Sequence, residues 1–226
     1  MSVSTSALEM IRVVKIQARA GYFGPSLEIS ENVLEAMSRV PRHEFVSQNK
    51  KYAYRDQPVP IECKQTMSQP YIVAYMTHTL DIHPEHKVLE IGMGSGYGAS
   101  VISEICSSVC SIERIPTLYK RATETCKRLG YNIKSKNDDG HKGWVEEAPF
   151  DRIMVTAVSK EIPQQLVDQL KIGGKMLIPH NPNITNPSAN NVCDMFLVTK
   201  DETGWKKKNL RQGCKFVPFL KDFTID

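Results

Sequence analysis

The feature that most constrains the fold of this chain is a strand-like run that leads straight into closely spaced glycines. Residues 88–91 favour a strand, glycines occupy positions 92, 94, 96 and 98, and residues 99–106 can form a helix. This order of strand, glycine turn and helix brings backbone close to a cofactor at the carboxyl edge of an α/β sheet. Glycine reaches positive φ and has no Cβ, so a ligand can lie against its main chain. The stretch therefore predicts a cofactor-binding turn of the nucleotide type.

Strand and helix patterns alternate beyond this turn. Further strands are predicted at 108–112, 131–136, 151–156 and 175–178, with helices at 116–129 and 161–170. Alternation on this scale predicts an α/β fold with a doubly wound, Rossmann-like, mostly parallel sheet. Two last strands, at 193–199 and 214–220, are expected to form a C-terminal antiparallel hairpin with a turn around Gly204.

The N-terminal part favours helices instead. One is predicted over residues 4–20, a second from Ser30 to Val40, and a third that begins at Ser68 or Gln69. We therefore expect a single domain of 226 residues. Its three parts are a helical cap with a substrate loop (1–81), a cofactor-binding core (82–179), and a C-terminal loop and hairpin (180–226).

Composition excludes several classes of function. The net charge is only +4, and the basic run 206–208 is expected to be a solvated loop rather than a nucleic-acid site. No stretch reaches the roughly 20 apolar residues of a membrane span. The six cysteines form no C-x-x-C pair, and His83 and His86 lack a third nearby metal ligand. We expect a cytoplasmic protein with no metal, nucleic-acid partner or membrane contact.

The glycine spacing and the later carboxylates indicate which cofactor binds. A dinucleotide fingerprint would place its third glycine where Tyr97 stands, whereas G-x-G-x-G resembles the first motif of S-adenosylmethionine-dependent methyltransferases. Glu113 follows the next strand and could accept hydrogen bonds from ribose hydroxyls. Asp139, before Gly140, could accept from the amine of adenine. Together with Glu90, these residues favour S-adenosylmethionine.

A polar loop precedes the third helix. Thr66 and Ser68 place hydroxyls near the free N–H groups of the helix that begins about Pro70, a suitable place for a carboxylate. The same two residues could instead simply cap the helix. Both interpretations remain open from the local sequence.

At this point the sequence resembles the protein-L-isoaspartate O-methyltransferases. The resemblance covers about residues 30–179, and its segments are 40–46, 65–71, 88–98, 111–115, 139–144 and 148–151, with 216–218 similar to the family's last strand. It implies methyl transfer from S-adenosylmethionine to the α-carboxylate of an isoaspartyl residue in damaged proteins or peptides. The resulting ester then collapses to a succinimide that can reopen to aspartate.

The resemblance also implies the site residues. Ser68 is the family's active-site serine, expected to orient the acceptor carboxylate. The residues implied for the cofactor are Gln65, Thr66, Met67, Glu90, Gly92, Met93, Gly94, Gly96, Glu113, Arg114, Asp139 and Gly140. Those implied for the substrate are Ile61, Thr66, Ser68, Pro179 and Val217. A carboxylate with a pKa near ~4 is already ionised, so no general base is required.

The chain departs from the family in two loops. Family members usually carry Gly-x-Gly where this chain has Glu62 to Lys64, and Pro-Val-Gly where it has Pro179, His180 and Asn181. Glu62 would repel an anionic substrate, whereas Lys64 would attract one. The alternative function is therefore a relative that methylates another carboxylate, in a modified peptide or a small metabolite. We expect the protein to be a monomer.

Overall fold

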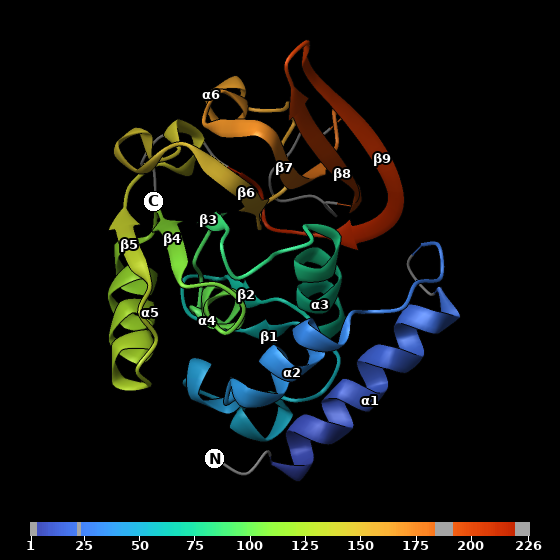
Figure 1. Cartoon of the computed structure of the whole chain (residues 1–226). Helices are drawn as coiled ribbons and strands as arrows, with labels where there is room; N and C mark the ends of the chain where they lie inside the picture. The colour runs from blue at the N-terminus through green and yellow to red at the C-terminus, as the bar shows by residue number, and fades with distance from the viewer. Residues whose placement is uncertain (1–3, 22–23, 184–191, 220–226) are drawn as a thin grey trace.

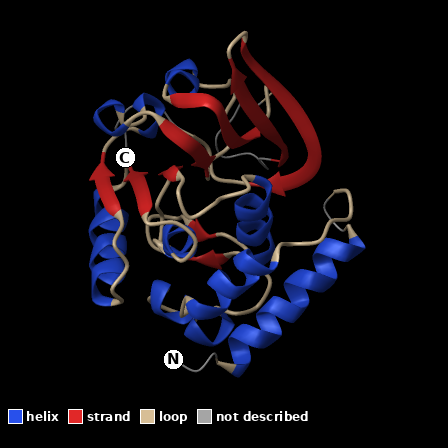
Figure 2. Ribbon diagram, in the orientation of Figure 1, coloured by secondary structure: helices blue, strands red, loops and turns tan. Residues whose placement is uncertain are grey.

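Within the residues that the structure describes (4–21, 24–183 and 192–219), seven strands form the central sheet of this computed structural model (Figures 1 and 2). Their bounds are β3 (Lys87–Ile91), β4 (Ser108–Glu113), β5 (Lys134–Asn137), β6 (Phe150–Val155), β7 (Leu170–His180), β8 (Val192–Asp201) and β9 (Gly204–Lys215). Their order is β5-β4-β3-β6-β7-β8-β9. The first five are parallel, whereas β8 and β9 are antiparallel to their neighbours. The predicted mostly parallel sheet with a C-terminal antiparallel hairpin is confirmed.

Helices and short turns connect and cover these strands. The α-helices are α1 (Thr5–Ala20), α2 (Glu31–Arg39), α3 (Pro70–Thr79), α4 (Tyr97–Ser103), α5 (Pro116–Arg128) and α6 (Gln164–Asp168). The 3-10 turns are η1 (Arg42–Phe45), η2 (Lys50–Tyr52), η3 (Gly140–Lys142) and η4 (Val145–Glu147). A separate small hairpin pairs β1 (Val59–Pro60) with β2 (Thr66–Met67).

The N-terminal helices form where the sequence predicts them. Ser4 accepts a 3.1 Å hydrogen bond from the Ala7 N–H at the start of α1, and Gly21 ends the helix at φ 64°. The buried stripe of α1 includes Met10 and Val14. The helix packs against α2 and α3, as Figure 1 shows.

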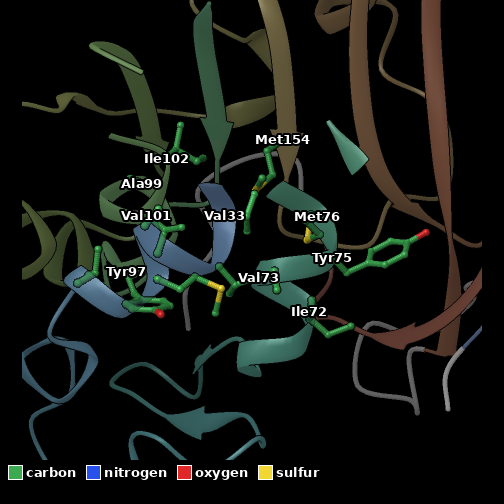
Figure 3. Close-up of a cluster of buried hydrophobic side chains, with 14 of the residues drawn as sticks. Val33, Ile72, Val73, Tyr75, Met76, Tyr97, Ala99, Val101, Ile102 and Met154 are labelled. Carbon is green, nitrogen blue, oxygen red and sulfur yellow. The ribbon is translucent and has the colours of Figure 1, made fainter. Parts of the chain in front are cut away.

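The core has two parts, one on each face of the sheet. On one face, side chains of the N-terminal helices, α4 and α5 pack against Val88, Val109 and Met154. Figure 3 shows part of this cluster, with side chains of α2, α3 and α4 around Met154. On the other face, Leu89 and Ile91 pack with residues around η4 and α6. Because successive side chains of β3 point to opposite faces, this strand is covered on both sides, and its apolar run follows from that. The glycine turn at its end is therefore held by a buried strand.

Four predicted elements differ from those observed. The third parallel strand begins only at Lys134, since residues 131–133 follow the αL turn at Gly130. Helix α6 has five residues, and Gly173 and Gly174 lie inside β7 rather than in a helix-ending turn. The last strand spans 204–215 instead of 214–220, so the basic run 206–208 lies on the edge strand β9 and not in a loop. Part of the Asn/Pro-rich segment 180–191 lies outside the described residues.

Candidate functional site

A pocket opens where the glycine turn meets the carboxyl ends of β3 and β4. We call it the cofactor pocket. Most of the predicted site residues line it, namely Gln65, Thr66, Met67, Ser68, Glu90, Gly92, Met93, Gly94, Glu113, Arg114, Gly140 and Val217. They come from the β1–β2 hairpin, the glycine turn, β4, η3 and the C-terminal segment, which the fold brings to one edge of the sheet.

Hydrogen bonds hold the glycine turn in place. The Gly94 N–H donates to Oε2 of Glu113 over 2.8 Å, and the Thr156 hydroxyl donates to the Gly92 carbonyl over 2.8 Å. Gly92, Gly94 and Gly96 all have positive φ. Each bond joins the turn to the end of a neighbouring strand, so the backbone of the turn is fixed before any ligand binds.

Glu113 lies at the carboxyl end of β4 and is largely buried. Its Oε1 accepts a 2.9 Å hydrogen bond from the Ile115 N–H, while Oε2 is bound by Gly94. Burial raises the pKa of Glu113, against the opposing effect of the backbone N–H groups that bond to it. Because each carboxylate oxygen has two lone pairs, both oxygens can still accept a hydroxyl from a ligand in the pocket.

Glu90 lies deeper, on β3, and is 1% exposed. Its Oε2 accepts a 2.6 Å hydrogen bond from the hydroxyl of Ser111, its neighbour on β4. Desolvation by burial raises the pKa of Glu90 to about 8, with a smaller contribution from the charge of Glu113 and against the bond from Ser111. Glu90 thus stands protonated below that pH at the floor of the pocket.

The far end of the cofactor pocket is apolar. Phe219 stacks on the ring of His141, with centroids 3.6 Å apart and planes 19° apart, and it lies against Gly140. Its position is fixed because its N–H donates to the Val158 carbonyl over 2.8 Å. Asp139 is adjacent to this wall, where its Oδ1 accepts the backbone N–H of His141 at 2.9 Å.

A second pocket adjoins the cofactor pocket. Thr66, Ser68, Thr156 and Val217 line both, so they lie where the two pockets meet. The remaining wall of the second pocket is formed by Pro58, Gln69 and Ile72, by Val192 at the start of β8, and by residues 213–216 at and after the end of β9. A group bound in the second pocket would face one bound in the cofactor pocket across Thr66 and Ser68.

The start of α3 is capped by a residue outside the polar loop that precedes it. Gln69 is the N-cap residue, but its side chain makes no capping hydrogen bond. Instead Asp56 accepts the Tyr71 N–H over 2.8 Å and the Gln69 side-chain amide over 2.8 Å. Within the described chain, the Ser68 hydroxyl makes no hydrogen bond that would commit it to the cap, so it is free to serve a ligand.

The sequence did not identify Arg42, which holds the loop of Ser68 from below. Its guanidinium is fully buried and donates to the carbonyls of Ala53 over 2.6 Å and Ser68 over 2.5 Å. It also lies over the ring of Tyr97, 4.5 Å from the centroid. Only the family-like segment 40–46 pointed to this region, because the contacts connect residues 11 to 55 positions apart in the chain. Phe219 was missed for the same reason.

Two predicted substrate residues are placed differently. Ile61 borders the glycine turn, with its Cδ1 3.9 Å from where a Cβ on Gly94 would lie. Pro179 is at the end of β7, where its carbonyl accepts the Ser159 N–H, and it lies outside the described lining of both pockets. The following His180 is buried, and its Nδ1 lies 3.1 Å from the Ser159 carbonyl. Glu62 forms an ion pair with Arg121 of α5, which offsets the charge expected to repel a substrate.

The chemistry of the cofactor pocket fits S-adenosylmethionine. Among the described residues, only Ile61 has an atom within 4 Å of where a Cβ on Gly94 would be, so the main chain at Gly94 faces open space. A carboxylate suited to a ribose (Glu113) and an apolar end suited to an aromatic base (Ile115, Leu118 and Phe219) line the same pocket. In the described residues no helix has the length and apolarity to span a membrane, and no three potential ligands are grouped as a metal would need.

Comparison with known proteins gives a consistent result. Residues 25–223 match the family model described as protein-L-isoaspartate(D-aspartate) O-methyltransferase. A protein-L-isoaspartate O-methyltransferase of Syntrophus aciditrophicus is 43% identical over 221 residues, which are 95% of each chain. Protein-L-isoaspartate O-methyltransferase 2 of Syntrophobacter fumaroxidans is 47% identical over 84% of this chain and 75% of its own.

Two solved structures are similar over almost the whole chain. One, a protein-L-isoaspartate O-methyltransferase, has a TM-score of 0.78 at 25% identity and covers 94% of this chain and 65% of its own. The other, from Plasmodium falciparum in complex with S-adenosyl-L-homocysteine, has a TM-score of 0.76 at 23% identity. It covers 97% of this chain and 100% of its own, and it supports the fold.

Proposed function

The chain belongs to the protein-L-isoaspartate(D-aspartate) O-methyltransferase family, and we propose that it methylates isoaspartyl carboxylates of damaged proteins and peptides with S-adenosylmethionine as donor. The observation that carries this proposal is the junction of the two pockets at Thr66 and Ser68. One pocket is built for a nucleoside, and the other opens beside a free hydroxyl. The similar structure from Plasmodium falciparum is a complex with S-adenosyl-L-homocysteine, the product that S-adenosylmethionine leaves after methyl transfer.

We assign the donor site to residues of the cofactor pocket. Glu113 would hold the ribose hydroxyls, and the main chain of Gly92 to Gly94 would lie against the ligand. Gly140 and Phe219 would enclose the base, with Asp139 beside it. When bound, the cofactor supplies a methyl group on a positively charged sulfur. Gln65, Thr66 and Met67 would close the pocket on the acceptor side.

The protein's part in the reaction is placement. The acceptor carboxylate has a pKa near ~4 and is ionised at neutral pH, so no residue has to remove a proton. Ser68 would donate a hydrogen bond to one carboxylate oxygen and leave the other oxygen in line with the methyl group. Arg42 would keep the Ser68 backbone fixed through the carbonyl that it binds. Alignment of this kind replaces an encounter in solution by a reaction between groups already held in place. It can therefore supply much of the reduction in the activation barrier.

A paired-peptide assay tests the function. The protein is incubated with labelled S-adenosylmethionine and either an isoaspartyl peptide or its aspartyl twin. We expect a base-labile methyl ester on the isoaspartyl peptide alone. Equal labelling of both peptides, or of neither, would contradict the proposal.

We further propose that the enzyme is a monomer in the cytoplasm, with a cap (1–81), a core (82–179) and a C-terminal part (180–226) in one domain. Support for a monomer comes from the site, because one chain supplies both pockets. The cysteine usage of the sequence supports a reducing compartment. Sedimentation at micromolar concentration tests the oligomeric state.

A further inference from the structure

An ion pair joins the tip of the β1–β2 hairpin to helix α5, on the other side of the glycine turn. Glu62, at the tip, forms an ion pair with Arg121 of α5, 59 residues later in the chain. The Arg121 side chain is 27% exposed and that of Glu62 34% exposed, so water only partly screens the pair. Although partial burial opposes its ionisation, Glu62 has a lowered pKa because its own backbone N–H, Arg121 and Ser47 hydrogen-bond to it.

The residues at this tip are unfavourable for the backbone conformation that they adopt. The Ile61 N–H donates to the Gln65 carbonyl over 2.9 Å, and the Gln65 N–H donates to the Glu62 carbonyl over 3.1 Å. Between them, Cys63 and Lys64 both have φ of 56°. Two consecutive residues at positive φ are the pattern of a type I′ turn, which prefers Asn-Gly and which other residues adopt at a cost. Only two residue pairs of β1 and β2 support the hairpin besides this turn.

The ion pair connects two elements that border the cofactor pocket. The hairpin lies over the glycine turn through Ile61, and residues 65–68, which include its second strand, line the pocket. Helix α5 is fixed beneath the same turn, because Ala122 and Cys126 pack against Gly96. The ion pair therefore joins the hairpin, which contributes residues to the pocket, to the helix that packs under the glycine turn.

From this arrangement we propose that the Glu62–Arg121 ion pair is a latch that holds the β1–β2 hairpin closed over the cofactor pocket. Glu62 and Arg121 are positioning residues: they act on the cofactor through the hairpin and not by contact. The proposal rests on the proposed function only in taking S-adenosylmethionine and S-adenosylhomocysteine as the ligands of this pocket. It predicts that breaking the pair weakens binding of both ligands and speeds opening of the hairpin.

The main test measures ligand binding by calorimetry in Glu62→Gln and in Arg121→Gln. Each change is expected to raise the Kd of S-adenosylhomocysteine about three- to tenfold, within the range for loss of a partly buried ion pair. The Kd of S-adenosylmethionine should rise by the same factor. The double Gln variant should be no weaker than either single variant, because the two residues act as one unit. Arg128→Gln, which removes a 2.8 Å pair with Glu44 at the end of the same helix, is the matched control and should leave both Kd values unchanged.

Two further measurements separate a latch from a direct electrostatic attraction between Glu62 and the cofactor. If Glu62 attracted the positive sulfonium directly, Glu62→Gln would weaken S-adenosylmethionine but not the neutral S-adenosylhomocysteine, and the latch would be refuted. In the ligand-free protein, hydrogen exchange of the Ile61 and Gln65 amides should speed up in Glu62→Gln and not in Arg128→Gln. Adding Cys63→Asn and Lys64→Gly, which suit the type I′ turn, should restore binding to Glu62→Gln.

Unchanged binding in both single variants, or additive losses in the double variant, would overturn the proposal. These outcomes are distinct from failure of the proposed function, because binding and exchange need no acceptor. A wild-type protein that fails to methylate the isoaspartyl peptide would refute the function and leave the latch standing.

Discussion

The hydroxyl of Ser111 donates a 2.6 Å hydrogen bond to the carboxylate of Glu90, and the two residues face each other on β4 and β3. The other carboxylate oxygen lies so close to Gly98 that a Cβ there would approach it to 2.5 Å. Glu90 is thus enclosed on both sides at the point where the sheet meets the glycine turn. Its burial raises its pKa to about 8.

This raised pKa predicts how stability depends on pH. Folded Glu90 keeps a proton that the unfolded chain loses above the ordinary pKa of 4.5, so the stabilising contribution is fully present below 4.5 and is lost as the pH rises to about 8. In Glu90→Gln this loss is absent. Between pH 5 and 8 the free energy of unfolding of the variant, relative to wild type, should rise by up to about 1.4 kcal/mol per pH unit.

Urea unfolding of the ligand-free proteins at several pH values measures this difference. Glu85→Gln is the control, since Glu85 is exposed and is expected to track the wild type at every pH. A difference between Glu90→Gln and wild type that stays constant from pH 5 to 8 would show that Glu90 titrates normally.

The second prediction concerns Gly96, whose φ is 90°. A Cβ there would lie 2.8 Å from Cys126 Sγ and 3.4 Å from the Cβ of Ala122. Gly96→Ala therefore combines backbone strain with a clash against α5, and we expect it to cost roughly 2–4 kcal/mol of stability. Affinity for S-adenosylhomocysteine should also fall, because the turn cannot keep its position.

Gly130→Ala separates the two causes. Gly130 has a similar φ of 83°, but no atom of the described residues lies within 4 Å of where its Cβ would be. Its substitution should cost only the strain, roughly 1 kcal/mol, and leave binding intact. If thermal unfolding shows that the two variants lose equal amounts of stability, the clash with α5 does not contribute to the effect of Gly96→Ala.

The third prediction concerns Arg42. Arg42→Met leaves the carbonyls of Ala53 and Ser68 without their donor in a buried region, which should cost roughly 2–4 kcal/mol. Because Ser68 then loses its support, kcat/KM for an isoaspartyl peptide should fall by more than the affinity for S-adenosylhomocysteine. Arg39→Met is the control: its 2.7 Å pair with Glu104 is at the surface, so its loss should cost less than about 1 kcal/mol. Equal effects of the two substitutions on kcat/KM would contradict a supporting role for Arg42.

The elements that the sequence predicted well are those whose cause is local. The turn from β3 into α4 follows from its glycines. Helix α1 begins after Ser4 and ends before Gly21, because a cap residue and an αL residue flank it directly in the chain. The edge strand β9 was misplaced because its Lys206 to Lys208 lack the alternation of a half-buried strand. An edge strand with exposed side chains does not need that alternation, and lysines there discourage pairing with other chains.

The part of the site that escaped prediction depends on contacts between distant segments. Asp56 caps α3 from 15 positions upstream, and Phe219 closes the pocket against His141. Glu62 was expected to repel a substrate, but Arg121 lies beside it. Residue types and spacing identify the groups able to bind a ligand. Which groups are already occupied by the protein itself is decided by tertiary structure.

The last prediction concerns Ser68, whose backbone is held by Arg42 and whose hydroxyl lies where the two pockets meet. A hydrogen bond to a charged group contributes about 1.5–3 kcal/mol. Ser68→Ala should therefore lower kcat/KM for the isoaspartyl peptide about ten- to a hundredfold. The Kd of S-adenosylhomocysteine should stay within about twofold, because the hydroxyl is assigned to the acceptor. Ser107→Ala, at an exposed serine outside the lining of both pockets, is the matched control and should leave kcat/KM for the peptide within about twofold. A loss of S-adenosylhomocysteine affinity in Ser68→Ala as large as the loss in kcat/KM would move Ser68 to the donor site and refute its proposed role.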